Sequence, residues 1–269
     1  MRNTPPASWR DLLADPGPVG HVVQLYQDED FFGEAVAHFA AEGLARNEAV
    51  ILVATRSHWT NVSRRLATRG LDVNALSRRH QLTVLDADLT LPKFMAGNQP
   101  DARTFKDLAG QTIEKARAGG KFAGVRWWGE MVNVLYVGGN KGGSHRLEQL
   151  FDEVAHEQSI AIFCSFLMDK YDARIYDEDF GNVCGTHSHV IAAENVASHK
   201  EAVNRAIREV IGEIKGPLFR SLALWSGVPC LMPSSQALLL WVKETLPVHF
   251  DEVIARSRAY DKAQATLSP

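Results

Sequence analysis

The stretch Ala49-Val-Ile-Leu-Val-Ala54 decides the fold class, because it is apolar at every position. A half-exposed strand alternates apolar and polar residues, whereas a strand covered on both faces reads as a continuous apolar run. Such strands occur in parallel sheets whose two faces are packed against helices. We therefore expect this segment to be a central strand of a parallel sheet.

Strand and helix patterns alternate along the chain around this segment. Helical spacing of apolar residues follows several short runs that are bounded by glycine or polar residues. This alternation predicts βαβ units with right-handed crossovers, and so an α/β fold with a mostly parallel sheet and helices on both faces. The other predicted strands are His21–Tyr26, Leu82–Asp86, Phe122–Trp128, Ser159–Phe166 and His189–Ala192. Ser57 is expected to cap the helix after the Ala49–Ala54 strand.

The pattern predicts three parts of the chain. Residues 1–19 hold four prolines and no sustained period, which indicates an N-terminal arm. Residues 20–194 form the α/β domain. Residues 195–269 contain helical patterns without strands, and they are expected to form a helical appendage for dimerisation or for docking of a partner. Its predicted helices begin with one around Val203–Ile214 and continue with Leu218–Trp225 and Ser235–Leu246.

Composition excludes several classes of protein. The chain has 269 residues, a formal net charge of −3 and three cysteines. The absence of a basic excess argues against direct binding to nucleic acid. The apolar runs are too short to span a bilayer, and no exported leader is recognisable, so no membrane association is expected. Three cysteines suit a reducing compartment, and we predict a cytoplasmic protein.

Several spaced landmarks give the chain a resemblance to a known family. They include His21-x4-Tyr26, Gly43-Leu44-x3-Glu48 and Gly129-Glu-Met131, and they continue with Gly139-Asn140, Arg146-Leu-Glu148, the Ile160–Cys164 strand and His187-Ser-His-Val190. Over roughly residues 20–192 the chain resembles the MEDS family, the methanogen/methylotroph, DcmR-type sensory domain. The same region is similar to the RecA/KaiC type of ATPase fold. The resemblance implies a RecA-like sheet used as a signal-input module.

ATP hydrolysis is not expected from this sequence. A P-loop needs glycines and a lysine after the first strand, but Gln27-Asp-Glu-Asp30 stands there and its carboxylates would repel a triphosphate. The Phe122–Trp128 strand also ends in two tryptophans instead of the magnesium-binding Asp. We therefore predict a protein that is not an enzyme, with no catalytic residue and no cofactor. A regulator that binds a nucleotide without hydrolysing it is the alternative.

Polar residues that follow the predicted strands mark the expected ligand site. Ligands of open α/β sheets bind beyond the carboxyl ends of the strands. An aromatic pair beside charged groups suits a small organic ligand with an apolar body and one polar handle. In the competing interpretation, the two tryptophans pack on opposite faces of the sheet and Arg126 pairs with Glu130 or a neighbour. The predicted ligand-binding residues are Tyr26, Asp28, Thr55, Asp86, Arg126, Trp127, Trp128 and Glu130.

The sequence also leaves open a metal-dependent enzyme. Cys184-x2-His187-x-His189 is a dense group of metal-ligating residue types, although no second pair supports it. Cys164, in an apolar strand, is expected to be a buried small hydrophobe. Cys230 has no visible activating base. His21, at the start of the first strand, is expected to fix the entry of that strand by a hydrogen bond.

Together these patterns predict a bacterial or archaeal signal-transduction sensor or regulator without catalytic activity. A small ligand would bind at the carboxyl ends of the strands, and the helical appendage would pass the signal to another signalling protein or through a homodimer. Regulation of transcription is the expected output.

Overall fold

The computed structural model describes residues 8–177, 179–212 and 231–265. The chain divides into two compact units, Met1–Leu167 and Met168–Pro269. The helix predicted over Leu218–Trp225 and the residue Cys230 lie outside the described residues. The predicted domain limits at residues 19 and 194 stay predictions.

The first unit is built on five parallel strands. They lie in the order β3-β2-β6-β7-β1, and every neighbouring pair is parallel. This confirms the predicted α/β class. The strands are β1 (His21–Tyr26), β2 (Ala49–Ala54), β3 (Leu82–Asp86), β6 (Val125–Gly129) and β7 (Ala161–Leu167).

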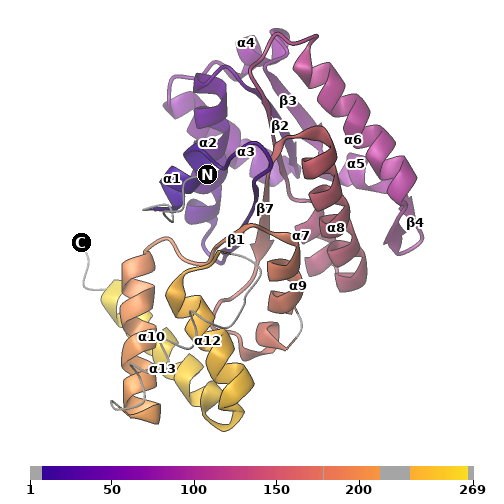
Figure 1. The fold of residues 1–269 in the computed structure, drawn as a ribbon. Helices are drawn as coiled ribbons and strands as arrows, with labels where there is room; N and C mark the ends of the chain where they lie inside the picture. The colour runs from indigo at the N-terminus through magenta and orange to yellow at the C-terminus, as the bar shows by residue number, and fades with distance from the viewer. Residues whose placement is uncertain (1–7, 178, 213–230, 266–269) are drawn as a thin grey trace. The chain divides into compact units, whose positions relative to one another are not determined.

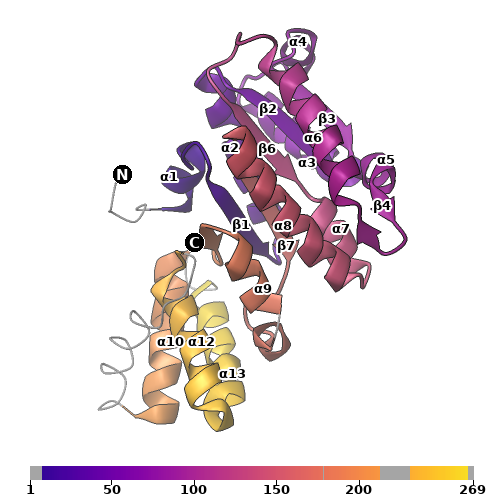
Figure 2. The same ribbon diagram turned by 45° about the vertical axis from the view of Figure 1, so that its right-hand side comes forward.

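Helices cover both faces of this sheet (Figure 1). The helices α2 and α3 lie on one face, and α6 and α8 run side by side across the other (Figure 2). The short strands β4 and β5 form a separate two-stranded hairpin. The remaining elements of the unit are α1 (Trp9–Ala14), α2 (Glu29–Ala45), α3 (Arg56–Thr68), α4 (Val73–Arg78), α5 (Ala87–Thr90), η1 (Leu91–Lys93), β4 (Met95–Ala96), β5 (Gln99–Pro100), α6 (Ala102–Arg117), α7 (Met131–Val137) and α8 (Lys141–Gln158).

Alternating side chains of β6 fill the core on both sides of the sheet. Trp128 packs toward α2, with its ring centroid 5.7 Å from that of Phe32. Trp127 points to the opposite face, 5.8 Å from Phe151 of α8. Both indoles are buried. The twofold repeat of a strand therefore places neighbouring tryptophans in two separate hydrophobic layers.

Polar side chains define several helix starts. Asp28 caps the start of α2, and its Oδ1 accepts hydrogen bonds from the backbone N–H groups of Asp30 and Phe31 at 2.7 and 2.8 Å. Such caps satisfy backbone donors that have no partner within the helix. The predicted cap at Ser57 is wrong, because the capping position is Thr55, two residues earlier, and Ser57 lies inside α3. The last strand residue Ala54 leads directly into that capping position.

The second unit is mainly helical among its described residues, and this agrees with the helical C-terminal region expected from the sequence. The helices α10, α12 and α13 pack against one another. Tyr176 contacts both Phe180 and Phe250 in the core of this unit. The elements are η2 (Ala173–Tyr176), α9 (Asp179–Thr186), β8 (His189–Ile191), α10 (Val196–Ile211), α12 (Ser234–Thr245) and α13 (Pro247–Ala265).

No helix in the described ranges combines the length and the apolar character needed to cross a membrane.

Candidate functional site

The connections of the sheet create a switch point between β2 and β6. The chain leaves β2 through α3 on one face, and it leaves β6 through α7 and α8 toward the other face (Figure 1). Adjacent strands whose connections diverge in this way leave a crevice beyond their carboxyl ends, where ligands of open α/β sheets bind. The side chains at this point therefore form the first candidate site, which we call the switch-point group: Tyr26, Glu29, Phe32, Thr55, His58, Glu130 and Asn133.

Glu130 stands at the centre of the switch-point group. It is the first residue after β6, and only 1% of its surface is exposed. Its Oε1 accepts a hydrogen bond from the backbone N–H of Thr55 at the end of β2. Its Oε2 forms an ion pair with Nδ1 of His58. A buried carboxylate therefore ties the two diverging strands together, as a buried charge requires partners.

His58 presents the most accessible polar ring of the group. It lies in the first turn of α3, and its side chain is 18% exposed. Its Nε2 lies 3.3 Å from a carboxylate oxygen of the exposed Glu29. Burial alone would lower the pKa of His58, but the hydrogen bond and charge of Glu130, together with Glu29, outweigh burial and raise that pKa.

Aromatic side chains form the apolar part of the group. Phe32 lies 4.4 Å from the His58 ring and stacks on Tyr26 at 4.5 Å between ring centroids. The Tyr26 hydroxyl accepts a hydrogen bond of 3.4 Å from the Asn133 side chain. Asn133 also accepts the backbone N–H of Leu167 at 2.9 Å, at the end of β7. Asn133 of α7 thus joins the ends of β1 and β7.

Arg126 lies away from the switch-point group. It is the second residue of β6, so its position is near the amino end of the strand. Its guanidinium pairs with Glu48 and donates hydrogen bonds of 2.8 Å to the backbone oxygens of Leu13 and Ala14. The predicted strand Phe122–Trp128 placed Arg126 near its carboxyl end, and this position is wrong, because β6 begins at Val125 and extends three residues beyond Arg126.

Four other predicted ligand residues have structural roles outside the contacts of His58 and Glu130, although Trp128 packs beneath Phe32 of the group. Asp28 is engaged as the cap of α2. Asp86 caps α5 by accepting the backbone N–H of Leu89 at 3.1 Å, and its strand β3 is separated from β6 by β2. Trp127 and Trp128 are core residues, and Trp128 donates a hydrogen bond of 3.1 Å to Ser165. Of the eight predicted residues, the structure brings together Tyr26, Thr55 and Glu130.

Sequence reasoning missed the histidine of this group. His58 follows the Ala49–Ala54 strand by four residues and belongs to the first turn of the next helix. A polar residue so soon after a predicted strand could have been included among the candidate ligand residues. Glu29, Phe32 and Asn133 gave no such signal, because helical periodicity does not reveal which strand ends a helix residue approaches.

The packing around Arg126 leads to a stability prediction for Gly43, in α2. A Cβ atom at Gly43 would lie 2.7 Å from Cδ of Arg126 and 3.1 Å from Cγ2 of Val50. We expect Gly43→Ala to lower the free energy of unfolding by about 1–3 kcal/mol, the usual cost of overpacking. Urea denaturation measures this change. Gly110→Ala, in α6, is the matched control, because no atom lies within 4 Å of its added Cβ and the alanine should stabilise the helix by up to about 1 kcal/mol. Equal effects of the two substitutions would contradict the close packing at Gly43.

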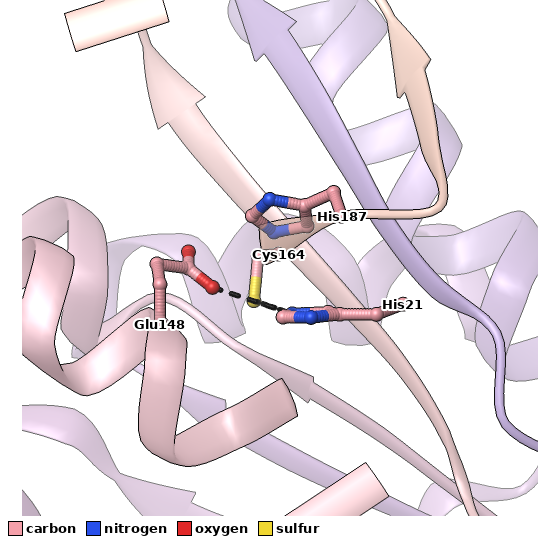
Figure 3. Close-up of side chains that lie close together, drawn as sticks. All are labelled: His21, Glu148, Cys164 and His187. Carbon is pink, nitrogen blue, oxygen red and sulfur yellow. Dashed lines mark hydrogen bonds and ion pairs between the residues drawn. The ribbon is translucent and has the colours of Figure 1, made fainter. Parts of the chain in front are cut away.

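A second group lies on the α8 face of the sheet (Figure 3). His21 of β1, Cys164 of β7 and Glu148 of α8 present donor atoms that all lie within 4.8 Å of one another. Nε2 of His21 is 3.5 Å from the Cys164 sulfur and 3.3 Å from a Glu148 oxygen. All three side chains are buried. His187, which is also drawn, belongs to the second unit, and the first unit alone supplies three donors.

The pKa values of this group follow from its carboxylates. Burial alone would lower the pKa of His21, but hydrogen bonds with Asp152 and Glu148 outweigh it and raise that pKa to about 9. Burial, and then the charge of Glu148, raise the pKa of the Cys164 thiol well above its ordinary value. Without a metal the group is therefore a protonated imidazole paired with carboxylates, beside a neutral thiol.

The predicted set Cys184, His187 and His189 does not converge. Within the described part of the chain, Cys184 and His189 belong to no group of metal-ligating side chains. Cys184 is buried in α9, and Nδ1 of His189 lies 3.0 Å from the Ser188 hydroxyl. The described residues therefore give no support to a metal site made of Cys184, His187 and His189 together.

A comparison with models of known families identifies the family of this chain. A family model described as MEDS, the MEthanogen/methylotroph, DcmR Sensory domain, matches residues 20–188. The match spans more than half of the chain. The chain belongs to the MEDS family. Among curated proteins, no sequence matches the chain.

Membership of the MEDS family confirms the resemblance seen in the sequence, and the RecA/KaiC-like part of it stays a prediction. The matched residues contain the whole five-stranded sheet. The landmark residues of the resemblance lie in three parts of the fold. Gly43 and Glu48 pack against Arg126, and Tyr26 belongs to the switch-point group. The second group contains His21, Glu148 and Cys164. A MEDS sensory domain indicates a role in signal transduction.

Proposed function

We propose that this MEDS protein is a non-catalytic sensor that binds a small organic ligand at the switch-point group. The observation that carries this proposal is the placement of Glu130, which joins the ends of β2 and β6 where their connections diverge. That position is the usual ligand site of an open α/β sheet. The family supplies the sensory role.

The polar contacts of His58 favour a ligand with a hydrogen-bond acceptor. Glu130 holds Nδ1, whereas the partner of Nε2 is the exposed carboxylate of Glu29. A carboxylate or hydroxyl oxygen on the ligand can take the place of Glu29, which returns to water at little cost. Phe32 and Tyr26 offer apolar contact to the rest of the molecule.

A nucleotide suits this end of the sheet less well. The first turn of α2 carries Glu29 and Asp30, and two of its N–H groups already bind Asp28. A phosphate at this helix start would meet carboxylates in place of free donors. The geometry therefore favours an organic ligand of low charge over a triphosphate.

In the proposed mechanism the ligand changes the contacts of the chain with other proteins. The packed helices α10, α12 and α13 are the candidate output surface, through a homodimer or a separate signalling protein that controls transcription. A ligand transmits a signal only when it favours one arrangement over another. Replacement of Glu29 at His58 offers such a difference, because it alters the first turn of α2.

Native mass spectrometry of the full-length protein tests the ligand site. We expect the wild-type protein to retain an organic mass that is lost on denaturation, or to bind small carboxylic acids and alcohols from a screened panel. His58→Gln should weaken that binding at least tenfold, because glutamine lacks the ring that pairs with Glu130 through Nδ1 and presents Nε2 to the ligand. The matched control is His38→Gln, in α2, whose ring contacts the Arg10 backbone oxygen at 2.9 Å. Equal affinity of wild type and His58→Gln would overturn the proposed site.

A further inference from the structure

We propose that His21, Glu148 and Cys164 form a binding site for one divalent transition-metal ion, with zinc the ion that best suits these donors. The three side chains come from β1, α8 and β7 of one compact unit, and at most 2% of each side chain or residue is exposed. This proposal is independent of the ligand site, because none of its residues belongs to the switch-point group.

Donor spacing is the first argument for the site. Zinc binds sulfur at about 2.3 Å, and it binds nitrogen or carboxylate oxygen at about 2.0–2.2 Å in tetrahedral geometry. These bond lengths require about 3.6 Å between sulfur and nitrogen and about 3.4 Å between nitrogen and oxygen. The observed separations from Nε2 of His21 are 3.5 Å to the Cys164 sulfur and 3.3 Å to the Glu148 oxygen. The side chains therefore need little rearrangement to hold the ion.

The sheet and the helix make this spacing a property of the fold. In the pairing of β1 with β7, His21 stands opposite Ile162 and Val23 opposite Cys164. His21 and Cys164 are thus two positions apart along the register and project from the same face. Helix α8 covers that face and brings Glu148 to both of them (Figure 3).

Asp152 supplies a second, independent argument. It follows Glu148 by one helical turn in α8, and its Oδ1 lies 3.5 Å from Nδ1 of His21. A histidine that binds a metal through one ring nitrogen commonly directs the other toward a carboxylate, which fixes the ring and strengthens its donor atom. His21 has this arrangement, with Nε2 directed at the cysteine and glutamate and Nδ1 at Asp152.

The donor set indicates the class of metal. A thiolate and an imidazole favour zinc, cobalt or nickel over magnesium and calcium, which prefer oxygen ligands. Metal binding requires deprotonated cysteine and neutral histidine, so it releases protons from the group. A metal-free hydrogen-bonded ion pair is the competing interpretation, and the two differ in whether Cys164 binds an added metal as thiolate.

Cobalt titration of the full-length protein distinguishes the metal site from the metal-free ion pair. After removal of metal with a chelator, Co²⁺ is added under reducing conditions and the absorption spectrum is recorded. We expect one Co²⁺ per chain, with a thiolate-to-cobalt charge-transfer band and the visible bands of tetrahedral cobalt, all displaced by Zn²⁺. Cys164→Ser should abolish the charge-transfer band. Cys184→Ser, which changes the buried cysteine of α9, should keep it. The absence of the band in the folded wild-type protein, or its persistence in Cys164→Ser, would overturn the proposal.

A second variant guards against loss of folding in Cys164→Ser. Asp152 is 39% exposed, so Asp152→Asn leaves the buried donors in place. We expect it to keep the charge-transfer band and to weaken Co²⁺ binding about 10–100-fold, the usual effect of losing such a supporting carboxylate. Circular dichroism of each metal-free variant confirms the fold before titration. A Co²⁺ affinity of Asp152→Asn equal to that of wild type would remove the second argument and contradict the proposed orientation of His21.

Discussion

Arg126→Ala is expected to lower the free energy of unfolding of the first unit by about 3–5 kcal/mol, the cost of removing one partner of a buried ion pair. The Arg126 side chain is 2% exposed and pairs with Glu48, whose side chain is 23% exposed. The same guanidinium holds the backbone oxygens of Leu13 and Ala14, at the end of α1. The substitution leaves these three acceptors without their donor and opens a cavity beside Phe39.

Urea denaturation and calorimetry measure this effect. For a unit of this size a loss of about 4 kcal/mol corresponds to a fall in Tm of roughly 8–15 °C. Arg126→Lys is the informative comparison, because it keeps the charge and loses the forked geometry that reaches Glu48 and α1 together. It should fall between wild type and Arg126→Ala. A fall in the free energy of unfolding below about 1 kcal/mol in Arg126→Ala is in the range of exposed ion pairs. It would show that the hydrogen bonds of Arg126 to α1 contribute little to stability.

Arg126 and Gly43 should not behave independently. Because the Cβ added in Gly43→Ala meets Arg126 itself, the alanine should cost little once Arg126 has been shortened. A double-mutant cycle isolates this coupling, which for residues in contact is about 0.5–3 kcal/mol. Additive losses would mean that the clash is relieved elsewhere.

Acid is expected to destabilise the second unit through His199, by about 3 kcal/mol between pH 6.5 and pH 4. His199 is fully buried, with Nδ1 2.7 Å from the Tyr171 hydroxyl and Nε2 3.3 Å from Oε1 of Gln236. Burial, reinforced by the charge of Lys170, lowers its pKa to about 4, and Asp261 opposes this shift. The folded state therefore stays neutral at pH values where the unfolded state takes up a proton.

The sign of this effect follows from the proton balance. Between pH 6.5 and pH 4 the unfolded state binds more protons at His199, so the free energy of unfolding falls as the pH falls. Urea titrations of wild type and His199→Gln over pH 4–8 measure the difference in slope. Wild type should lose more stability than His199→Gln below pH 6.5, and the two slopes should agree between pH 7 and 8. Parallel slopes over the whole range would contradict a neutral buried His199.

Local sequence was sufficient to predict the sheet of this protein. The limits predicted for His21–Tyr26, Ala49–Ala54 and Leu82–Asp86 are those observed in the structure, because short apolar runs between turn residues are a local property of the chain. The strand predicted from Phe122 begins three residues late, at Val125. That shift moved the expected strand position of Arg126, and with it the predicted content of the ligand site.

Family membership was also readable from spaced residues. The sequence did not reveal which side chains come together in space. His21 and Cys164 are 143 positions apart in the chain and 3.5 Å apart in space. The twofold repeat of a strand gives the face on which a side chain lies, but it does not give the neighbouring strand.

By itself, then, the sequence determined the α/β class, three complete strands, the helical character of the C-terminal region and the sensory family. Only the tertiary structure decided that β1 lies beside β7, that Glu130 meets His58, and that Arg126 supports α1. The physical reason is that burial and periodicity act on each segment alone. Strand order and the crossing of helices arise from packing between segments, and this packing brings distant polar residues together.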